Sequence, residues 1–421
     1  MKNSQRWLRI IPVALIMYTI SYIDRTNVSL ALDPAMSSMM QELGMDDEMK
    51  GRAMGIFFIG YMLLQIPGGY LANRWSAKRF VSLLLVLWGA CAVACGFAKT
   101  YWQFNVARFF LGIAEGGVWP AVLVLLANWF PRAERARANA WWIICLPLAV
   151  VFSAPLSTWL IHQWHWQTMI IVEGAFPFLW LPIWWYFIED HPGEAKWLKA
   201  EERDSLQAIL QQESHDLQPV RPMPLWQAFF HLVALVLMGV YFLQNCAVYG
   251  CMPFLTEGLK GGGLVPGSVA YGLLFALPYL ITAVLMVLNS THSDKKRERR
   301  GHMAVGYILA GLCLIASVKI AQMPHGFWPS YALLCLAVAG PFAAIPPFWA
   351  IPTETLPRQV AGPVMGLVNA IGNLGGFFGP SIVGVLKKQT GGISVPFMVL
   401  GAGLLGAAAL CSALPGRRKA P

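Results

Sequence analysis

Twelve apolar stretches limit what this chain can fold into. Each is near or above the roughly 20 residues that an α-helix needs to cross a bilayer. They cover approximately residues 10–32, 51–72, 80–98, 102–127, 138–160, 167–188, 226–250, 266–288, 302–321, 327–350, 360–386 and 393–414. Only 12% of the residues are charged, whereas soluble domains carry about 25%. We therefore predict an all-α membrane protein with twelve transmembrane helices, whose first stretch is too long and too charged to be a cleaved signal peptide.

A charged segment at residues 189–225 separates these stretches into two sets of six. The two halves echo each other, because "GGYLANRWSAKR" follows the second stretch and "LNSTHSDKKRERR" follows the eighth. The pattern predicts an N-terminal six-helix bundle at 1–188, a cytoplasmic linker loop at 189–225 and a pseudo-symmetric C-terminal bundle at 226–421. Such repeats are typical of secondary transporters, whose sites lie at the repeat interface near the membrane midplane.

Basic residues predict the orientation. The short segments on the side of the two termini hold 18 Lys and Arg residues and those on the other side hold seven, while the central segment adds four. Cytoplasmic loops carry the excess of Lys and Arg, so we expect both termini and the central segment to be cytoplasmic. This distribution accounts for most of the formal charge of +10 and argues against a nucleic-acid partner.

Asp24, Arg25, Arg108 and Glu115 are four charged side chains that lie well inside the predicted spans. Each costs at least about 2.5 to 3.5 kcal/mol at the bilayer centre. Arg108 and Glu115 are seven residues apart and share a helix face, with Gly112 between them on nearly the same face. At 1.5 Å per residue, all four can meet in one layer. Buried ion pairs rarely stabilise a fold better than apolar side chains, so we expect this cluster to be functional rather than structural.

The charge of this cluster predicts a coupled transport mechanism. Fully ionised, the four residues sum to zero, and an incoming carboxylate makes the sum −1. One proton on Glu115 or Asp24 restores neutrality, so anion and proton binding favour each other. A forked guanidinium suits carboxylate capture. We assign Arg25 to the substrate carboxylate, Glu115 to the transported proton, and Asp24, paired with Arg108, to orientation or a second proton, although Asp24 and Glu115 could exchange roles.

Several strings resemble known transporters. Twelve spans in two halves and "GGYLANRWSAK" are similar to the major facilitator superfamily, although Asn73 stands where that loop usually has Asp. Within it, the chain resembles the anion:cation symporter family over essentially its whole length. The strings that carry this resemblance are "YIDRTN", "QIPGGYLANR", "ARFFLGIAEGGVWP", "WFPRAERARANA" and "GLVNAIGNLGGFFGP".

The resemblance implies a bacterial inner-membrane protein that imports small organic carboxylates with protons. It implies that the four charged residues form the core of the site and that Tyr22, Tyr61 and Asn369 line the cavity. We take a sugar acid of the aldonate or aldarate type as the first expectation for the substrate. An aromatic or tartrate-like acid, or anion exchange without protons, are the alternatives, and a transporter-like receptor is a remote one. Asn73, Arg74 and Asp294 are candidate gating residues in the two echoing loops.

Other polar and aromatic residues in the spans are further candidates. Tyr241, Gln244 and Asn245 share a helix face and could line the cavity in the second half. Asn369 and Asn373, four residues apart, could bind substrate hydroxyls or bond across helices. Trp349 could stack on a ring, or anchor a helix as most tryptophans do. Glu173 lies near the outer end of its span, where we expect a hydrogen-bonded carboxylate at the membrane interface rather than a proton carrier.

The sequence gives no sign of an enzyme, a metal site or a cofactor. The eight cysteines show no metal-ligand spacing, and nearly all fall in apolar runs. The glycines of "NLGGFFGP" follow no strand and lack the Lys of a phosphate-binding loop. We expect a monomer in the lipid bilayer, with a small organic anion and a proton as its partners.

Overall fold

A computed structural model describes residues 5–215, 224–259, 265–266, 268–356 and 358–414. Within these ranges the regular structure is helical and contains no strand. Twelve helical segments are long and apolar enough to cross a membrane, which confirms the predicted number. They are Gln5–Ala31, Asp47–Arg74, Ala77–Gly96, Tyr101–Trp129, Arg137–Gln163, Trp166–Phe187, Leu232–Phe254, Val269–Lys296, Arg300–Ala321, Phe327–Pro352, Val360–Thr390 and Ser394–Cys411.

Seven of these segments are built from one helix each, apart from a short 3₁₀ turn that ends one of them. They are α1 (Gln5–Ala31), α3 (Asp47–Arg74), α4 (Ala77–Gly96), α13 (Leu232–Cys251) with η2 (Met252–Phe254), α15 (Val269–Lys296), α16 (Arg300–Ala321) and α21 (Ser394–Cys411).

The other five segments are each broken into two helices. The pairs are α5 (Tyr101–Gly116) with α6 (Val118–Trp129), α7 (Arg132–Ile143) with α8 (Cys145–Gln163), α9 (Trp166–Gly174) with α10 (Phe176–Phe187), α17 (Phe327–Ala343) with α18 (Ile345–Thr355), and α19 (Arg358–Asn373) with α20 (Gly375–Thr390). Four further helices lie outside the spans: α2 (Met39–Glu42), α11 (Ala200–His215), α12 (Leu225–Phe229) and α14 (Leu255–Gly258).

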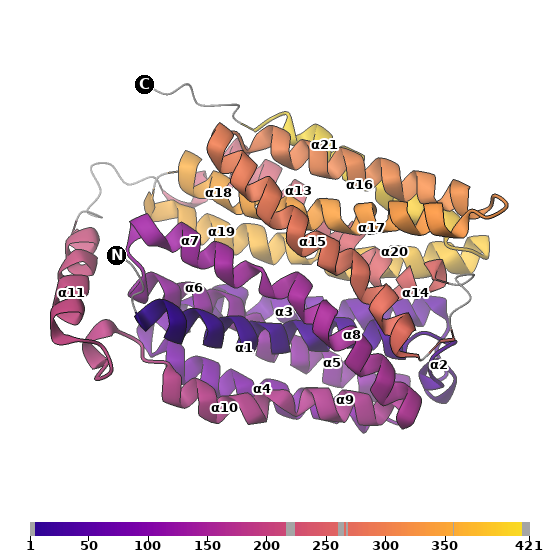
Figure 1. Cartoon of the computed structure of the whole chain (residues 1–421), viewed down its shortest axis with the longest axis horizontal. Coiled ribbons are helices and arrows are strands. Elements are labelled where there is room, and N and C mark those ends of the chain that lie inside the picture. The colour runs from indigo at the N-terminus through magenta and orange to yellow at the C-terminus, as the bar shows by residue number, and fades with distance from the viewer. Residues whose placement is uncertain (1–4, 216–223, 260–264, 267, 357, 415–421) are drawn as a thin grey trace.

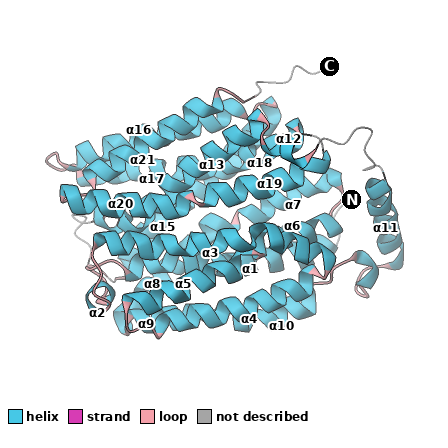
Figure 2. Ribbon diagram, turned by 180° about the vertical axis from the view of Figure 1, so that it is seen from behind, coloured by secondary structure: helices cyan, strands magenta, loops and turns pink. Residues whose placement is uncertain are grey.

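The two halves form two bundles that lie side by side. In Figure 1 the first half, indigo to magenta, occupies the lower part and the second half, orange to yellow, the upper part; Figure 2 shows the same division from behind. We call the end where α1 begins the terminal face and the end where α1 finishes and α3 begins the distal face. Helix α1 begins and α21 ends at the terminal face, as an even number of spans requires (Figure 1).

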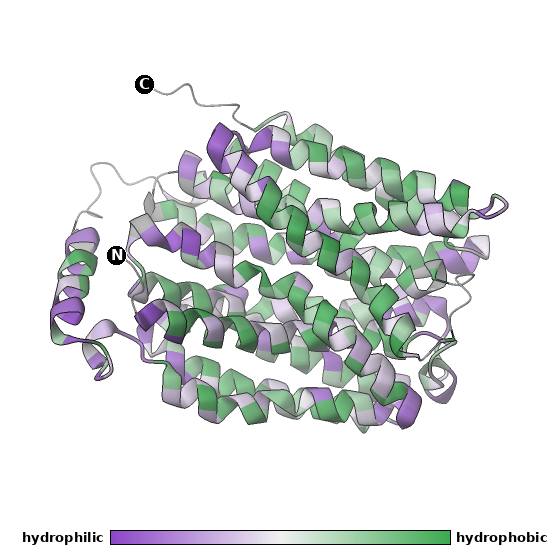
Figure 3. Ribbon diagram, viewed as in Figure 1, coloured by the Kyte–Doolittle hydropathy of each residue, from purple (hydrophilic) through white to green (hydrophobic). Residues whose placement is uncertain are grey.

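The outer surface fits a bilayer. Figure 3 shows hydrophobic residues along the length of the bundles and hydrophilic ones concentrated toward the two ends. Large apolar side chains such as Leu179, Val284 and Leu312 are more than half exposed, which water would not favour and lipid would. The chain is therefore a multi-pass membrane protein.

The central segment contains helices and is not simply the loop that we expected. It contains η1 (Pro192–Glu194) and the 16-residue helix α11, which lies beside the terminal face (Figure 1). Trp197 stacks on Trp129 of the first bundle with ring centroids 5.4 Å apart. Glu213 pairs with Arg135 at 3.9 Å. These contacts attach the segment to the first bundle.

Glycines determine how closely α3 packs against α5 and α20. A Cβ atom added to Gly112 of α5 would overlap the backbone carbonyl of Phe57 on α3, and one added to Gly116 would overlap that of Tyr61. Between the bundles, Gly51 of α3 meets the carbonyl of Pro380 on α20 in the same way. Small residues allow this close backbone packing in membranes, where the hydrophobic effect does not drive helices together.

We expect Gly112→Ala to destabilise the protein by about 1–3 kcal/mol, because the added methyl group forces α3 and α5 apart. The control is Gly366→Ala in α19, where an added Cβ has no neighbour within 4 Å and replacing a helical glycine stabilises by about 0.5–1 kcal/mol. Thermal unfolding of the detergent-purified proteins, followed by tryptophan fluorescence, compares the two. Equal shifts for both variants would contradict the packing role of Gly112.

Candidate functional site

An ion pair between Arg25 of α1 and Glu115 of α5 lies at the centre of the first bundle. The Arg25 Nε donates to Glu115 Oε2 at 2.9 Å, and Ser21 Oγ donates to the same oxygen at 2.7 Å. An Arg25 Nη also donates to Ser21 Oγ at 3.1 Å. Both charged side chains are buried, Arg25 to 4% exposure and Glu115 to 0%. Ser21, one helical turn before Arg25, was not among the predicted residues.

Asp24 and Arg108 meet, but not through their side chains, so the expected side-chain pair is wrong. An Arg108 Nη donates to the backbone carbonyl of Asp24 at 2.8 Å, and the Asp24 carboxylate accepts from the Trp88 indole on α4 at 2.6 Å. Successive residues of a helix point about 100° apart. Arg25 faces α5, so Asp24 is turned toward α4. Arg108 instead ties the backbone of α1 to α5.

The cluster keeps unused hydrogen-bonding capacity. Among the described residues, Glu115 Oε1 and Arg108 Nε are buried and have no hydrogen-bond partner. A buried polar atom without a partner costs about 1–3 kcal/mol. The site therefore offers one acceptor and one donor that a polar ligand can satisfy.

Aromatic rings surround the Arg25 guanidinium. Its carbon lies 4.4 Å from the ring centroid of Tyr61, 5.4 Å from those of Tyr18 and Phe57, and 5.8 Å from that of Tyr22. Ring faces attract a cation in a desolvated site, which offsets part of its burial cost. Tyr22 and Tyr61 thus lie at the charged cluster, as do Tyr18 and Phe57, which we did not anticipate.

An aromatic layer lies on the terminal side of Arg25, and it crosses between the bundles. The ring centroids of Trp119 and Trp142 are 4.4 Å apart, and Trp119 lies 6.4 Å from Trp349 of the second bundle. Trp349 in turn contacts Tyr241 at 5.4 Å, and Tyr18 contacts Trp119 at 5.3 Å. The indole nitrogens of Trp142 and Trp349 are buried without a hydrogen-bond partner in the described part of the chain.

Polar residues of the second bundle are mostly engaged with one another. Gln244 accepts from Tyr307 at 2.6 Å, Asn245 donates to the carbonyl of Gly372 at 3.1 Å, and Tyr241 stacks on Phe348 at 5.2 Å. Tyr241, Gln244 and Asn245 therefore contact α18, α16 and α19 respectively.

One amide pair joins the bundles beside this site. Asn369 Nδ2 donates to Gln65 Oε1 of α3 at 2.7 Å, and Asn373 donates to Asn369 Oδ1 at 3.0 Å. The Gln65 Nε2 is buried and, among the described residues, has no partner. Gln65 was not predicted, although an amide inside the apolar run of its span is a visible signal.

Glu173 occupies a different environment from the one we expected. It is 0% exposed and accepts from Ser157 Oγ at 2.6 Å and from Asn27 Nδ2 at 2.7 Å. The expectation of a hydrogen-bonded carboxylate is correct, and the side chain is buried between helices rather than exposed at the surface. The reason is that α9 turns this position toward α1 and α8 and away from lipid.

Ion pairs join the two bundles at the distal face. Lys387 of α20 contacts Asp47 at 2.8 Å, and Lys388 contacts Asp46 at 2.8 Å and Glu48 at 3.3 Å. We call these three contacts the distal ion pairs. The hydrogen bond from Lys388 holds the pKa of Asp46 below its usual range, and the backbone N–H of Met49 adds to this effect. Asp46 is therefore charged at neutral pH.

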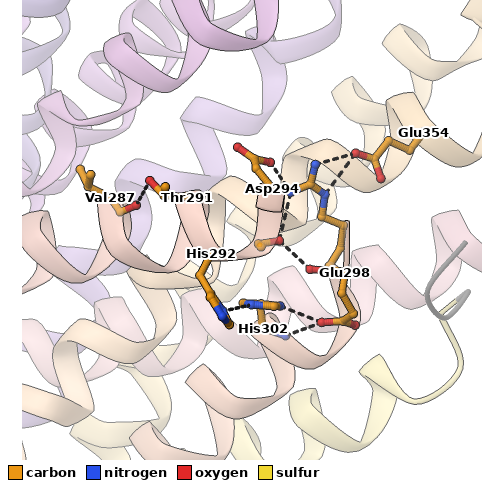
Figure 4. A network of polar contacts seen from close by, with 9 residues as sticks. Val287, Thr291, His292, Asp294, Glu298, His302 and Glu354 are labelled. Atoms are coloured by element: carbon orange, nitrogen blue, oxygen red, sulfur yellow. Dashed lines mark hydrogen bonds and ion pairs between the residues drawn. The ribbon is translucent and has the colours of Figure 1, made fainter. Parts of the chain in front are cut away.

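Charged residues at the terminal face are held within their own bundle. Asn73 and Arg74 are exposed, and Arg74 bonds Tyr70 of the same helix. In the second bundle Arg299 bonds Asp294 and pairs with Glu354 at 2.8 Å (Figure 4). Among the described residues, the candidate gating residues Asn73, Arg74 and Asp294 thus form no bond across the bundles, whereas the distal ion pairs cross them.

Next to Asp294, the echoing loop holds a second polar group. His302 bonds Glu298 at 2.7 Å, and the rings of His292 and His302 share a hydrogen bond of 2.7 Å (Figure 4). Burial alone would raise the pKa of Glu298, but hydrogen bonds from the backbone N–H of Gly301 and from His302 outweigh it and hold the pKa below its usual range. These bonds fix the loop between α15 and α16.

Comparison with known proteins shows the class of this one. The sequence profile of the Major Facilitator Superfamily matches residues 14–380, and the chain belongs to this superfamily of transporters. It is therefore a transporter and not an enzyme.

Its relatives and structural neighbours extend over the whole chain. The "Putative tartrate transporter" of Agrobacterium vitis is 31% identical over 398 residues, which cover 91% of this chain and 84% of that protein. The "Probable galactarate/D-glucarate transporter GudP" of Bacillus subtilis is 28% identical, covering 96% and 91%. The inward open structure of the xylose transporter XylE from E. coli shares the fold, with a TM-score of 0.77, 15% identity and coverage of 98% and 97%.

We expect the distal ion pairs to hold the distal face closed. Lys387→Asp places two like charges together, so the ratio of open to closed molecules should rise about fivefold, the equivalent of about 1 kcal/mol. The exchanged pair, Asp47→Lys with Lys387→Asp, should restore closure. Distances between spin labels at exposed Gln41 and Thr390 measure the two populations.

The pH dependence of this closure has a defined sign. The pKa of Asp46 is lowered in the folded protein. The free energy by which Asp46 stabilises the closed distal face is therefore present above the ordinary carboxyl pKa and is lost only as pH falls below about 4. The label distances should therefore be constant between pH 5 and pH 8. A distance distribution that Lys387→Asp leaves unchanged would show that the ion pairs do not hold this face.

Proposed function

We propose that this transporter is a proton-coupled symporter that imports a small organic carboxylate, most simply a sugar acid, by alternating access. The observation that carries the proposal is the buried Arg25–Glu115 ion pair, whose Glu115 Oε1 has no hydrogen-bond partner among the described residues. The names of the relatives, which include tartrate and galactarate or D-glucarate transporters, support an organic anion. The excess of Lys and Arg supports a cytoplasmic terminal face, and the bacterial relatives support the inner membrane.

Glu115 and the substrate would exchange places as partners of Arg25. When a proton neutralises Glu115, the Arg25 guanidinium loses its counter-charge and a substrate carboxylate replaces it. The cluster is neutral before and after this exchange, so substrate and proton binding favour each other. Arg108 holds the Asp24 backbone and so orients α1, while the Asp24 carboxylate can take a further proton.

The remaining candidates would contact the rest of the substrate. Asn369 and Gln65 offer amide groups for hydroxyls, and Tyr241 and Trp349 offer ring faces. Tyr22 and Tyr61 already contact Arg25, whereas Gln244, Asn245 and Asn373 would hold the substrate-contacting side chains in position.

Asn73, Arg74 and Asp294 would pair across the bundles when the terminal face closes. We expect the protein to act as a monomer, because one chain contains all of these groups.

A tartrate-like or aromatic carboxylate is the second candidate. The aromatic layer of Trp119, Trp142, Trp349 and Tyr241 would stack on a flat ring. A thermal-shift screen of the purified protein with D-gluconate, D-glucarate, L-tartrate and benzoate separates the candidates. Uptake of the stabilising acid into proteoliposomes, with and without a pH gradient that is acidic outside, then tests the coupling. Uptake that ignores the gradient in the wild type would leave anion exchange in place of symport.

We expect Glu115→Gln to abolish proton-driven uptake and to retain substrate binding and exchange. The amide keeps the shape of the side chain but cannot bind the transported proton. Accumulation under a pH gradient and counterflow of labelled substrate, measured in the same proteoliposomes, separate the two activities. Glu201→Gln on exposed α11 is the control and should behave as wild type. Gradient-driven accumulation by the Glu115 variant would assign the proton to another carboxylate.

Arg25→Ala should weaken binding of the carboxylate at least about 30-fold. Removing one partner of a buried charge pair costs about 2–5 kcal/mol, and 1.4 kcal/mol corresponds to tenfold in affinity. Arg25→Lys should recover part of the loss, since an ammonium keeps the charge but not the forked geometry. Isothermal calorimetry gives the affinities, with Arg203→Ala on α11 as the control. Wild-type affinity in Arg25→Ala would move the substrate contact to a different residue.

A further inference from the structure

Glu173 is a buried carboxyl group that the proposed exchange at Arg25 does not use. It is the penultimate residue of α9, directly before the break at Ala175 that separates α9 from α10. Two neutral groups donate to it, Ser157 Oγ to Oε1 at 2.6 Å and Asn27 Nδ2 to Oε2 at 2.7 Å. No ion pair joins it to a basic side chain within the described ranges of the chain. Each oxygen thus has one neutral donor and no counter-charge.

An ionised carboxylate is costly in such a place. Burying an unpaired charge is far more expensive than burying a hydrogen-bonded neutral group, and a group in this position takes up a proton instead. Arg25 and Arg108, the buried cations of the charged cluster, are already engaged with Glu115 and with the Asp24 backbone. The surroundings therefore favour the neutral acid unless a further charge approaches.

The helices packed against α9 bring one other buried carboxyl group to this region of the described chain. They are α1, α4, α8 and α10. Along these helices lie Tyr18, Tyr22, Asp24 and Arg25 of α1 and Cys91 and Cys95 of α4, and at their ends lie Arg6, Arg9, Lys78, Arg79, Cys145, His162 and Tyr186. The buried cations Arg6 and Arg25 are paired with Glu134 and Glu115. A negative Asp24, the buried carboxylate among these groups, further favours a neutral Glu173.

Asn27 connects Glu173 to the charged cluster. Asn27 lies three residues after Asp24 on α1, so the two side chains are neighbours on the helix surface. Its Nδ2 bonds Glu173, while its Oδ1 is buried and has no partner among the described residues. When Glu173 carries a proton, a turn of the amide places Oδ1 as acceptor for the new O–H. The unpartnered oxygen is thus suited to the proton-bound form.

The heights of the acids give them an order. Glu173 and Asp24 each lie seven residues from the distal end of their helices, which is about 10 Å at 1.5 Å per residue. Glu115 bonds Ser21 Oγ, and Ser21 lies three residues, about 4.5 Å, further from the distal end of α1 than Asp24. A proton that enters from the distal face meets Glu173 and Asp24 before it can reach Glu115.

We propose that Glu173 is a second proton-binding site of the transport cycle, loaded from the distal side. This inference rests on the proposed proton symport. In the loading step a proton from distal water binds a carboxylate oxygen of Glu173 and gives the neutral acid. In the release step the same O–H bond breaks and the proton leaves to water on the terminal side. No other bond forms or breaks, and each cycle carries one proton more than Glu115 alone would carry.

The test measures the number of protons moved per substrate. Wild type and Glu173→Gln are reconstituted in proteoliposomes with whichever of D-gluconate, D-glucarate or L-tartrate the wild type accumulates. When the substrate gradient balances a fixed pH gradient, net transport stops, and the size of that substrate gradient gives the number of protons moved per substrate molecule. Glutamine can accept from Asn27 and donate to Ser157, so it mimics the neutral acid. We expect the ratio to fall by one in Glu173→Gln and to return to the wild-type value in Glu173→Asp.

Two further variants test the proposal even if Glu173→Gln fails to fold. Asn27→Leu and Ser157→Ala each remove one donor to the carboxylate, which disfavours the charged form. The pH at half-maximal uptake should therefore move upward by about one unit, which corresponds to the free energy of one hydrogen bond to a charged group. A purely structural Glu173 would alter the amount of folded protein but leave this midpoint in place.

The outcomes separate this inference from the function on which it rests. A wild type whose uptake ignores the pH gradient overturns proton symport itself, and the inference with it. A wild type that couples to protons, together with an unchanged ratio in Glu173→Gln and unchanged midpoints in Asn27→Leu and Ser157→Ala, overturns only the role of Glu173.

Discussion

The ion pair between Arg25 and Glu115 is the interaction on which the centre of this structure depends. Two charges removed from water lose hydration that their mutual attraction only partly returns, and apolar replacements of such pairs are often equally stable. Here Ser21 and the rings of Tyr61, Tyr18 and Phe57 supply additional contacts. The pair is nonetheless a poor way to hold helices together and a good way to make the site respond to charge. Neutralising one partner leaves the other in need of a new counter-ion.

Helix α3 connects this centre to both faces of the molecule. Its first residue, Asp47, takes part in the distal ion pairs. Phe57 and Tyr61 in its middle lie over Arg25, and Gln65 bonds Asn369 of the second bundle. A movement of α3 relative to α19 and α20 that opens the distal face must therefore disturb the surroundings of Arg25. In the proposed mechanism gating and binding would therefore share one rigid element, as alternating access around a fixed site requires.

The spans could be predicted from the sequence because the bilayer dictates the length and polarity of each one. The meeting of Arg25 with Glu115 could also be expected from helix rise and from the cost of isolated charges. The partners of Asp24 and Glu173 could not. Which way a residue points depends on how each helix is rotated against its neighbours, and that rotation is set by close contacts such as Gly112 against the Phe57 carbonyl. Trp88, as the partner of Asp24, follows from that packing and from no local pattern.

Helix breaks explain why these residues lie where they do. Four of the five breaks, at Gly117, Ala175, Ala344 and Leu374, lie close to Glu115, Glu173, Trp349 and Asn373. A break frees backbone groups that lipid cannot satisfy, so it must face protein or a polar interior. It also allows the two parts of a span to tilt separately. Polar side chains and helix breaks thus both require a protein or polar interior. The candidate site therefore lies at the depth in the bundles where the broken spans can bend.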